Sequence, residues 1–270
     1  MLCSPSHKPT LSPALSQGRG RFSAFTLVEV MVALVILTLL LSAIAVPLAA
    51  VLDMRRQEET RRTLDEAREA LLGFAAAQAR LPCPASEASN GLESFAAGGD
   101  ASNGQCSNFL DGFLPAAALG LARLDSAGFA RDAWPGERNR IRYAVFGGAV
   151  NGVANPLTRA NGMQMATLAG LGAASHFLII CSTGQAATAS SCGPAANQLT
   201  RRAAVVLLSL GPNAGSTPGA GSDEARNLAG SIVFVHREAS LAAGNEFDDI
   251  LLWVPVHLVI NRLLMAGRLP

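Results

Sequence analysis

The chain has 270 residues, with 21 lysines and arginines against 20 aspartates and glutamates, and half of its residues are hydrophobic. A formal net charge of +1 excludes a strongly basic surface for nucleic-acid phosphates, and the apolar share excludes an intrinsically disordered chain. The length suits one or two domains.

The first element in chain order is an apolar segment at residues 25–52, which contains one acid, Glu29, and no base. A helix needs about 20 apolar residues to cross a bilayer core, so this segment predicts a transmembrane helix and argues against a purely cytosolic enzyme. A secretory signal peptide is one alternative, but its apolar region usually runs about 7–15 residues. A plain signal anchor is another, and because arginines lie on both sides, charge alone leaves its orientation open.

Glu29 lies one helical turn inside this apolar segment, where an ionised carboxylate is costly without a partner. One interpretation is a long side chain that reaches back to the membrane surface. The other is a carboxylate that meets a free amino group at the start of a neighbouring chain, where each charge offsets the desolvation of the other. Such a pairing would set the stagger between subunits.

The residues Ala24-Phe25-Thr26-Leu27-Val28-Glu29 follow a short basic leader and resemble the N-terminus of type IV pilins and pseudopilins. The resemblance implies that a prepilin peptidase cuts between Ala24 and Phe25, that the new N-terminus at Phe25 is methylated, and that Glu29 serves assembly. Ala24 stands where the family normally has glycine and keeps that side chain small. The resemblance also implies a cytoplasmic leader at residues 1–24, a single pass through the inner membrane at 25–52, and a periplasmic C-terminal domain.

Residues 53–80 contain no proline and continue the helical pattern as an amphipathic helix. One face, expected to lie on a globular domain, recurs at three- and four-residue spacing: Leu64, Ala67, Leu71, Phe74 and Gln78. The arginines and glutamates of the other face would meet water or neighbouring subunits. The helix is expected to end at 81–84, because Pro82 and Pro84 block its continuation.

Residues 81–270 form the expected globular domain, in which Gly-, Ser-, Asn- and Ala-rich loops separate short apolar runs. A final helix is predicted at 256–266, with Gly267 as its left-handed end. The fold class is therefore α+β: a long N-terminal helix, half transmembrane and half amphipathic, packed on a four- to five-stranded, mainly antiparallel sheet. Runs rich in β-branched and aromatic residues predict its strands: 141–146, 176–181, 203–210, 231–236 and 250–256.

The same resemblance extends more weakly into this domain. Leu114-Pro115, then Asp132-Ala133-Trp134-Pro135, then Tyr143 are similar in order to a Leu-Pro, Asp-Trp-Gly and Tyr pattern of pilin-like minor subunits and pseudopilins. Core packing with a satisfied polar group is the preferred interpretation of Trp134 and Tyr143, ahead of a ligand role.

Five cysteines become four if Cys3 leaves with the leader, and an even number in an exported chain favours disulfides. Three connectivities are possible. Pairing Cys83 with Cys106 and Cys181 with Cys192 is favoured, because each pair brackets one flexible loop. A zinc site is the rival, but the tight Cys-x-x-Cys spacing and a nearby histidine pair are missing.

Two acidic pairs lie at the ends of loops: Asp223-Glu224 and Asp248-Asp249. Their oxygens could converge on a calcium ion, although two solvated acidic turns are the simpler interpretation. Major pseudopilins place calcium in a C-terminal loop, and the resemblance brings that site to mind. The hypothesis is thus a calcium site in a protein that otherwise requires no cofactor.

No nucleophile with its base, phosphate loop or paired carboxylates in a cleft indicates an enzyme, and the histidines beside predicted strands read as structural. The favoured function is a structural subunit of a type IV pilus or type II secretion pseudopilus, of the minor kind. Its partners would be prepilin peptidase, other pilins and membrane lipid. Without its leader the chain has 18 bases against 20 acids, which implies no nucleic acid. A filament-tip adhesin or DNA-uptake module is the alternative, followed by a membrane-tethered periplasmic enzyme.

Overall fold

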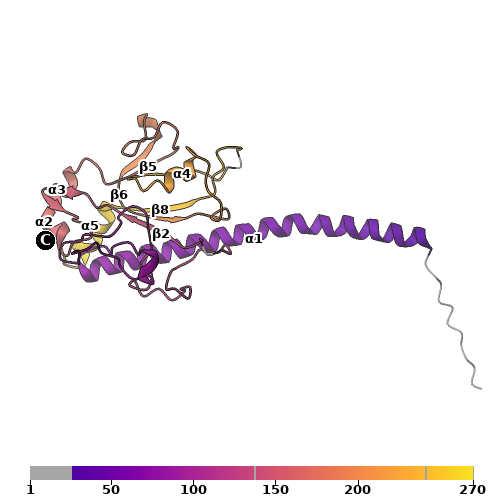
Figure 1. Cartoon of the computed structure of the whole chain (residues 1–270), viewed down its shortest axis with the longest axis horizontal. Helices are drawn as coiled ribbons and strands as arrows, with labels where there is room; N and C mark the ends of the chain where they lie inside the picture. Colours follow the sequence, from indigo (N-terminus) through magenta and orange to yellow (C-terminus); the bar gives the residue numbers. More distant parts are fainter. Residues whose placement is uncertain (1–25, 137, 241, 270) are drawn as a thin grey trace, which may run out of the picture. The chain divides into compact units, whose positions relative to one another are not determined.

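The computed structural model describes residues 26–136, 138–240 and 242–269, without the side chains of 43–47 and 49. The chain divides into two compact units, Met1–Val51 and Leu52–Pro270. Helix α1, Leu27–Gln78, supplies the described part of the first unit and the beginning of the second (Figure 1).

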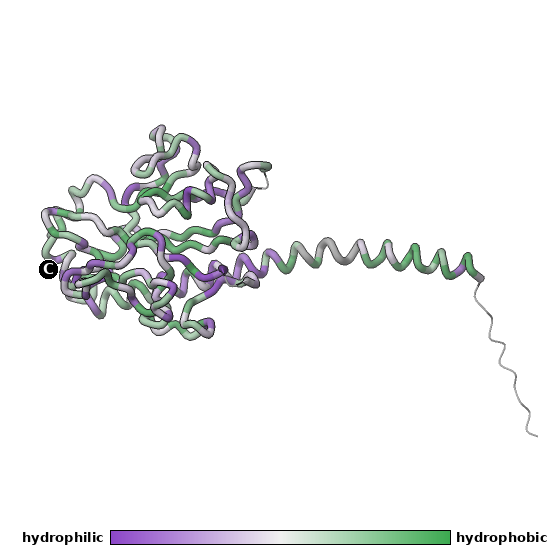
Figure 2. Tube along the Cα trace, in the orientation of Figure 1, coloured by the Kyte–Doolittle hydropathy of each residue, from purple (hydrophilic) through white to green (hydrophobic). Residues whose placement is uncertain are grey.

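In the first unit, the large apolar side chains that the structure describes are exposed, among them Leu27, Val35 and Leu40. Figure 2 shows this part of the trace as largely hydrophobic. Across the described residues, no helix combines the length and the apolar character that crossing a membrane requires.

In the second unit, the amphipathic part of α1 lies beside β2, β6 and β8 (Figure 1), and the prediction that Leu64, Ala67 and Leu71 face the domain is confirmed. The face differs near its end, because Ala75 is buried whereas Phe74 is half-buried and Gln78 is exposed. The buried residues recur at three- and four-residue spacing: Thr60, Leu64, Ala67, Leu71 and Ala75.

Helix α1 ends at Gln78, slightly before the prolines that were expected to stop it. Ala79 adopts the left-handed conformation, with φ of 54°, and so turns the chain out of the helix before Pro82. Arg268 then satisfies two carbonyls of the last turn, since its guanidinium donates to Ala76 O at 3.1 Å and to Ala77 O at 2.7 Å.

The main sheet has six strands in the order β1-β2-β6-β5-β7, with β8 paired to β6 as well. Every pairing in it is antiparallel except β5 with β7, which confirms the mainly antiparallel α+β class. The strands are β1 Gly112–Phe113, β2 Arg142–Val145, β5 Leu178–Cys181, β6 Gln198–Ser209, β7 Val233–Val235 and β8 Ile250–Pro255.

All five predicted strands are present, and the sixth is the two-residue β1, which the sequence did not reveal. A separate hairpin, β3 Ala149–Val150 with β4 Val153–Ala154, also escaped prediction. The predicted final helix is confirmed as α5, Val256–Met265, with Gly267 left-handed at φ of 66°. The remaining helical elements are short: η1 Glu87–Ser89, α2 Gly162–Ala166, α3 Leu168–Ala173, η2 Ala195–Asn197 and α4 Asp223–Asn227.

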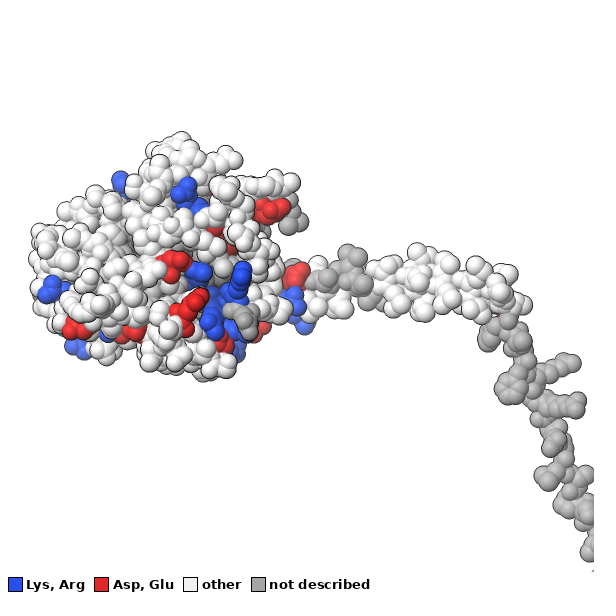
Figure 3. Space-filling view, viewed as in Figure 1, with Lys and Arg blue, Asp and Glu red and all other residues white. Residues whose placement is uncertain are grey.

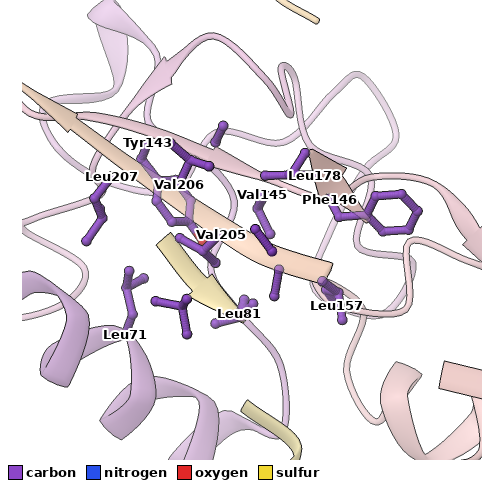
Figure 4. Packing of buried hydrophobic residues seen from close by; sticks show 14 of the residues in the cluster. Leu71, Leu81, Tyr143, Val145, Phe146, Leu157, Leu178, Val205, Val206 and Leu207 are labelled. Carbon is purple, nitrogen blue, oxygen red and sulfur yellow. The ribbon is translucent and has the colours of Figure 1, made fainter. Parts of the chain in front are cut away.

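The core lies between α1 and the sheet, where Leu71 of the helix and Leu207 of β6 belong to one buried cluster (Figure 4). Tyr143 is buried there, and its hydroxyl donates to Pro82 O at 3.0 Å. Trp134 is also buried, but its Nε1–H donates to no acceptor among the described residues, so the expectation of a satisfied polar group is confirmed for Tyr143 and is wrong for Trp134. Both aromatics therefore pack as core residues, and Tyr143 also fixes the chain just beyond α1.

Two disulfides join Cys83 to Cys106 and Cys181 to Cys192, the connectivity favoured from the sequence. The Cα atoms of the two pairs are 5.3 and 5.5 Å apart, within the usual range for a disulfide. The first disulfide closes the loop that follows α1, and the second closes the loop between β5 and β6.

Candidate functional site

The start of α1 is organised by Thr26 and Glu29. Thr26 N and Oγ1 donate to Glu29 Oε2 at 2.9 and 3.0 Å, and Glu29 N donates to Thr26 Oγ1 at 3.2 Å. This reciprocal arrangement is a capping box, which satisfies backbone N–H groups that the first helical turn leaves unpaired. The Thr-x-x-Glu spacing of the sequence predicts this capping box, but Glu29 was interpreted from the sequence through its charge alone, and the cap was missed.

The three hydrogen bonds of the capping box use one carboxylate oxygen of Glu29, and its Oε1 accepts none from the described residues. Glu29 is exposed, and Figure 3 shows the apolar part of α1 with almost no charged side chains in that view. The arrangement thus presents a carboxylate oxygen on an apolar helix. Ala24 and Phe25, the predicted processing residues, lie outside the described residues.

A second polar cluster lies in the globular unit, where α4 approaches the chain that leads into β8. The N-terminus of α4 is capped by Ser222, whose side chain accepts from Ala225 N, and the helix then presents Glu224. Carboxylate oxygens of Glu224, Asp248 and Asp249 lie within 4.8 Å of one another. We call these three residues the acidic triad.

Amides surround the acidic triad. Asn213 Nδ2 donates to both Glu224 oxygens, at 3.1 and 3.0 Å, and Asn227 Nδ2 donates to Asp249 Oδ2 at 2.7 Å. Asp248 Oδ1 is buried and has no hydrogen-bond partner among the described residues. The triad is therefore held in place by neutral donors, and no ion pair within the described residues neutralises its three carboxyl groups.

The close approach of these groups disfavours their ionised forms. Burial, reinforced by the charge of Glu224, raises the pKa of Asp248 to about 7. Burial raises the pKa of Asp249 to about 8, against the hydrogen bond from Asn227 and with a further increase from Glu224 and Asp248. At neutral pH, the triad thus needs either protons or a bound cation to offset its charge.

Asp223, the fourth residue of the predicted calcium set, does not join the acidic triad. Its Oδ2 lies 2.8 Å from Arg237 Nε in an ion pair whose N–H is not aligned for a hydrogen bond, and its Oδ1 accepts from Gly184 N. Asp223 and Glu224 are consecutive residues of α4, and successive side chains on a helix point about 100° apart. Glu224 therefore faces Asp248 and Asp249, whereas Asp223 faces Arg237.

The acidic triad has the donor chemistry for a hard cation. All its ligands are carboxylate oxygens, which calcium and magnesium prefer, and three carboxylates supply up to six of the six to eight oxygens that calcium takes. Gly211 packs against this group so closely that a Cβ there would lie 2.6 Å from Asp248 Oδ1. The residues present fit a metal ion, with the sequence-predicted ligand set reduced from four to three.

A family model described as the prokaryotic N-terminal methylation motif matches residues 19–45. Comparisons with curated proteins and with solved structures find no match. The matched region contains the expected cleavage position, the Thr26–Glu29 capping box and the first turns of α1. This motif implies processing by a prepilin peptidase, a membrane-anchored N-terminal helix and assembly with other pilins. The chain thus possesses the N-terminal signature of type IV pilins and pseudopilins.

Proposed function

We propose that the protein is a structural subunit, of the minor kind, of a type IV pilus or a type II secretion pseudopilus. The observation that supports this most strongly is the methylation motif at residues 19–45, with an exposed carboxylate one turn inside an apolar helix. The α+β domain with its two disulfides suits an exported subunit.

In this proposal, residues 1–24 are a cytoplasmic leader, residues 25–52 anchor the chain in the inner membrane with a single pass, and residues 81–270 lie in the periplasm. Residues 53–80 connect the anchor to the domain. The exposed apolar side chains of α1 support the anchor, since unpaired apolar surface on a helix requires lipid or other helices around it. After cleavage, such helices would leave lipid and pack together in the filament.

Glu29 is the proposed assembly residue. Its Oε2 already caps its own helix, whereas Oε1 is available to accept from the amino group at Phe25 of a neighbouring subunit. In an apolar surrounding, the two charges would each offset the other's desolvation, which favours one fixed stagger between chains.

Processing can be tested by expressing the full chain with an active or an inactive prepilin peptidase and measuring its intact mass. The proposal predicts loss of residues 1–24 and one added methyl group at Phe25, only with the active enzyme. Ala24→Gly should be cut at least as well as the natural chain, and Phe25→Asp should remain uncut. A chain that stays intact with active peptidase in both the natural and Ala24→Gly forms would refute the proposed processing.

Assembly can be tested separately, because the capping and the charge of Glu29 are separable. Glu29→Gln keeps a capping-box side chain and removes the charge, so it should be cut normally and fail to enter filaments. Thr26→Ala removes the cap and keeps the charge, so it should still assemble, with a helix start weakened by about 1 kcal/mol. Glu66→Gln, on the exposed face of the same helix, is the matched control. Filament entry by Glu29→Gln at the natural level would eliminate the assembly role.

The acidic triad is proposed to bind calcium in the periplasm. Calcium would replace the protons that Asp248 and Asp249 otherwise retain near neutral pH, and so stabilise the end of the domain where α4 meets β8. Titration of the full chain with calcium, followed by thermal unfolding, should show a rise in Tm that Asp248→Ala abolishes. If chelation leaves the melting of both proteins unchanged, the triad is a proton-sharing cluster and the calcium proposal is wrong.

A further inference from the structure

The globular unit contains a cavity at the junction of three strands, and no residue of the acidic triad lines it. Strand β8 pairs with β6 over 203–209, so β2, which pairs with β6 residues 205–208, must occupy the opposite edge. Ala203 pairs with Leu178 of β5 and also with Pro255 of β8, which places β5 on the same edge as β2. Strands β2 and β5 therefore follow one another along β6.

The chain leaves the sheet between these two strands and returns through the β3–β4 hairpin, α2 and α3. Phe146, directly after β2, and Phe177, directly before β5, meet edge to face with ring centroids 4.9 Å apart, and Figure 4 shows Phe146 close to Leu178. A cavity of about 600 Å³ lies at this junction, and we call it the junction pocket; its lining includes Phe109, Phe146, Asn151, Ala173 and His176. Its size is within the range of pockets that bind small molecules.

The lining of this junction pocket is apolar and uncharged. Phe109, Leu110, Val150 and Ile232 contribute apolar surface, and no Asp, Glu, Lys or Arg is among the described residues that line it. The absence of charge disfavours ionic ligands, because an ion moved into such a pocket would lose hydration without gaining a partner. The ligand class is thereby restricted to neutral molecules.

Glycines allow two aromatic rings to approach the backbone of the junction pocket closely. A Cβ at Gly147 would lie 2.3 Å from the Phe109 ring, and a Cβ at Gly148 would lie 2.4 Å from the Phe146 ring. His176 completes this group, with its ring edge to face with Phe146 at 6.3 Å between centroids. The pocket thus offers three aromatic rings, which bind the apolar face of another ring better than a flexible aliphatic chain.

His176 and Asn151 supply hydrogen-bond acceptors in the pocket, and the Ser175 hydroxyl, which also lines it, can donate or accept. His176 Nδ1 lies 3.2 Å from Phe177 O, a geometry that requires the proton on Nδ1 and makes Nε2 an acceptor in the neutral ring. Asn151 Nδ2 donates to Ala166 O at 3.2 Å, so the amide oxygen remains as its acceptor. Hydroxyl groups on the edge of a ligand, which can both donate and accept, would match these acceptors and the Ser175 hydroxyl.

We propose that the junction pocket binds a neutral hydroxylated ring, about the size of a disaccharide or smaller. Aromatic rings would contact its face, while His176 Nε2 and Asn151 Oδ1 accept from its hydroxyl groups. Two sources share this chemistry, a neutral sugar and a phenolic compound.

The test uses the full chain in lipid nanodiscs and saturation-transfer NMR, with empty nanodiscs as the blank. The probes are diacetylchitobiose as the neutral sugar, para-cresol as the phenol and glucuronate as the charged sugar. Ala173→Trp fills the pocket from an exposed lining position, and Ala220→Trp, on an exposed loop elsewhere, is its matched control. His176→Phe keeps an aromatic ring and removes the acceptor.

The proposal is supported if a neutral probe binds, if Ala173→Trp weakens that binding at least about tenfold, and if His176→Phe weakens it about fivefold. The probe that binds identifies the source as sugar or phenol. Ala220→Trp should leave the affinity unchanged. The proposal is overturned if neither neutral probe binds, if glucuronate binds equally well, or if neither Ala173→Trp nor His176→Phe alters binding. If Ala173→Trp does not fold, His176→Phe decides.

Discussion

Raising the pH from 5 to 8 in the presence of a chelator should destabilise the globular unit, because Asp248 and Asp249 must give up protons that the fold retains. The pKa values of about 7 and about 8 lie above the ordinary aspartate value of 3.8, so the folded state binds protons that the unfolded state has released. Stability is therefore fully present at low pH and is lost as the pH rises toward the folded pKa values.

Asp249 determines the size of the stability change, because its side chain is almost fully buried. A carboxyl group that is protonated when folded and ionised when unfolded changes the free energy of unfolding by about 1.4 kcal/mol per pH unit. Between pH 5 and pH 7, this residue alone should lower the stability by about 3 kcal/mol. For a domain of this size, that corresponds to a decrease in Tm of about 6–12 °C.

The assay is thermal unfolding at several pH values, comparing the natural chain with Asp249→Asn. The asparagine is neutral at every pH and can still accept from Asn227, so the Tm of the variant should depend less on pH by the amount above. His236 acts in the opposite direction, because burial and then Arg61 lower its pKa, but it contributes equally to both proteins. Glu246→Gln, exposed in the same loop, is the control. If the Tm of the natural chain and of Asp249→Asn changed equally with pH, Asp249 would not carry a proton in the folded state near neutral pH.

Two further predictions concern the segments beside the disulfides. Glu93→Gln should lower the free energy of unfolding by about 3 kcal/mol in denaturant titrations, because it leaves the buried Arg80 unpaired, whereas the exposed Glu87→Gln should have almost no effect; equal effects would exclude a stabilising ion pair. Replacing Cys181 and Cys192 together by serine should cost about 3 kcal/mol and remove the part of the reductant sensitivity that this disulfide provides. An unchanged midpoint would show that the loop is already ordered without it.

The longer strands, the long N-terminal helix and the final helix could be predicted from the sequence, because these features depend on local composition. β-Branched and aromatic runs identified β2, β5, β6, β7 and β8. The two-residue strands β1, β3 and β4 have no such run. β1 exists because the distant β2 pairs with it, whereas β3 and β4 form a local hairpin that is too short to give a pattern. The parallel pairing of β5 with β7 was also unpredictable, because β6 intervenes in the sequence and only the packed sheet determines which edge β7 joins.

The candidate sites divide in the same way. Cysteine pairing followed from loop bracketing, which is a local property, and the structure has that pairing. The acidic residues were recognised as two pairs, but which member of Asp223-Glu224 faces the other pair depends on the rotation of α4. The raised pKa values depend on burial, and Asn213, which donates to Glu224, comes from a different loop, while Asn227 of α4 reaches across to Asp249. None of these is visible in residue spacing.

The geometry at Glu29 reconciles two demands on one side chain. Any helix needs its first N–H groups satisfied, and the proposed assembly role needs a carboxylate oxygen that remains available in an apolar surrounding. Both donors of Thr26 meet Oε2, and the capping box therefore occupies one oxygen and holds the other in a defined direction. The proposed amine contact would then require no loss of the cap. Because the cap restricts the rotamers of Glu29, less side-chain entropy would be lost on docking than from an unrestrained glutamate.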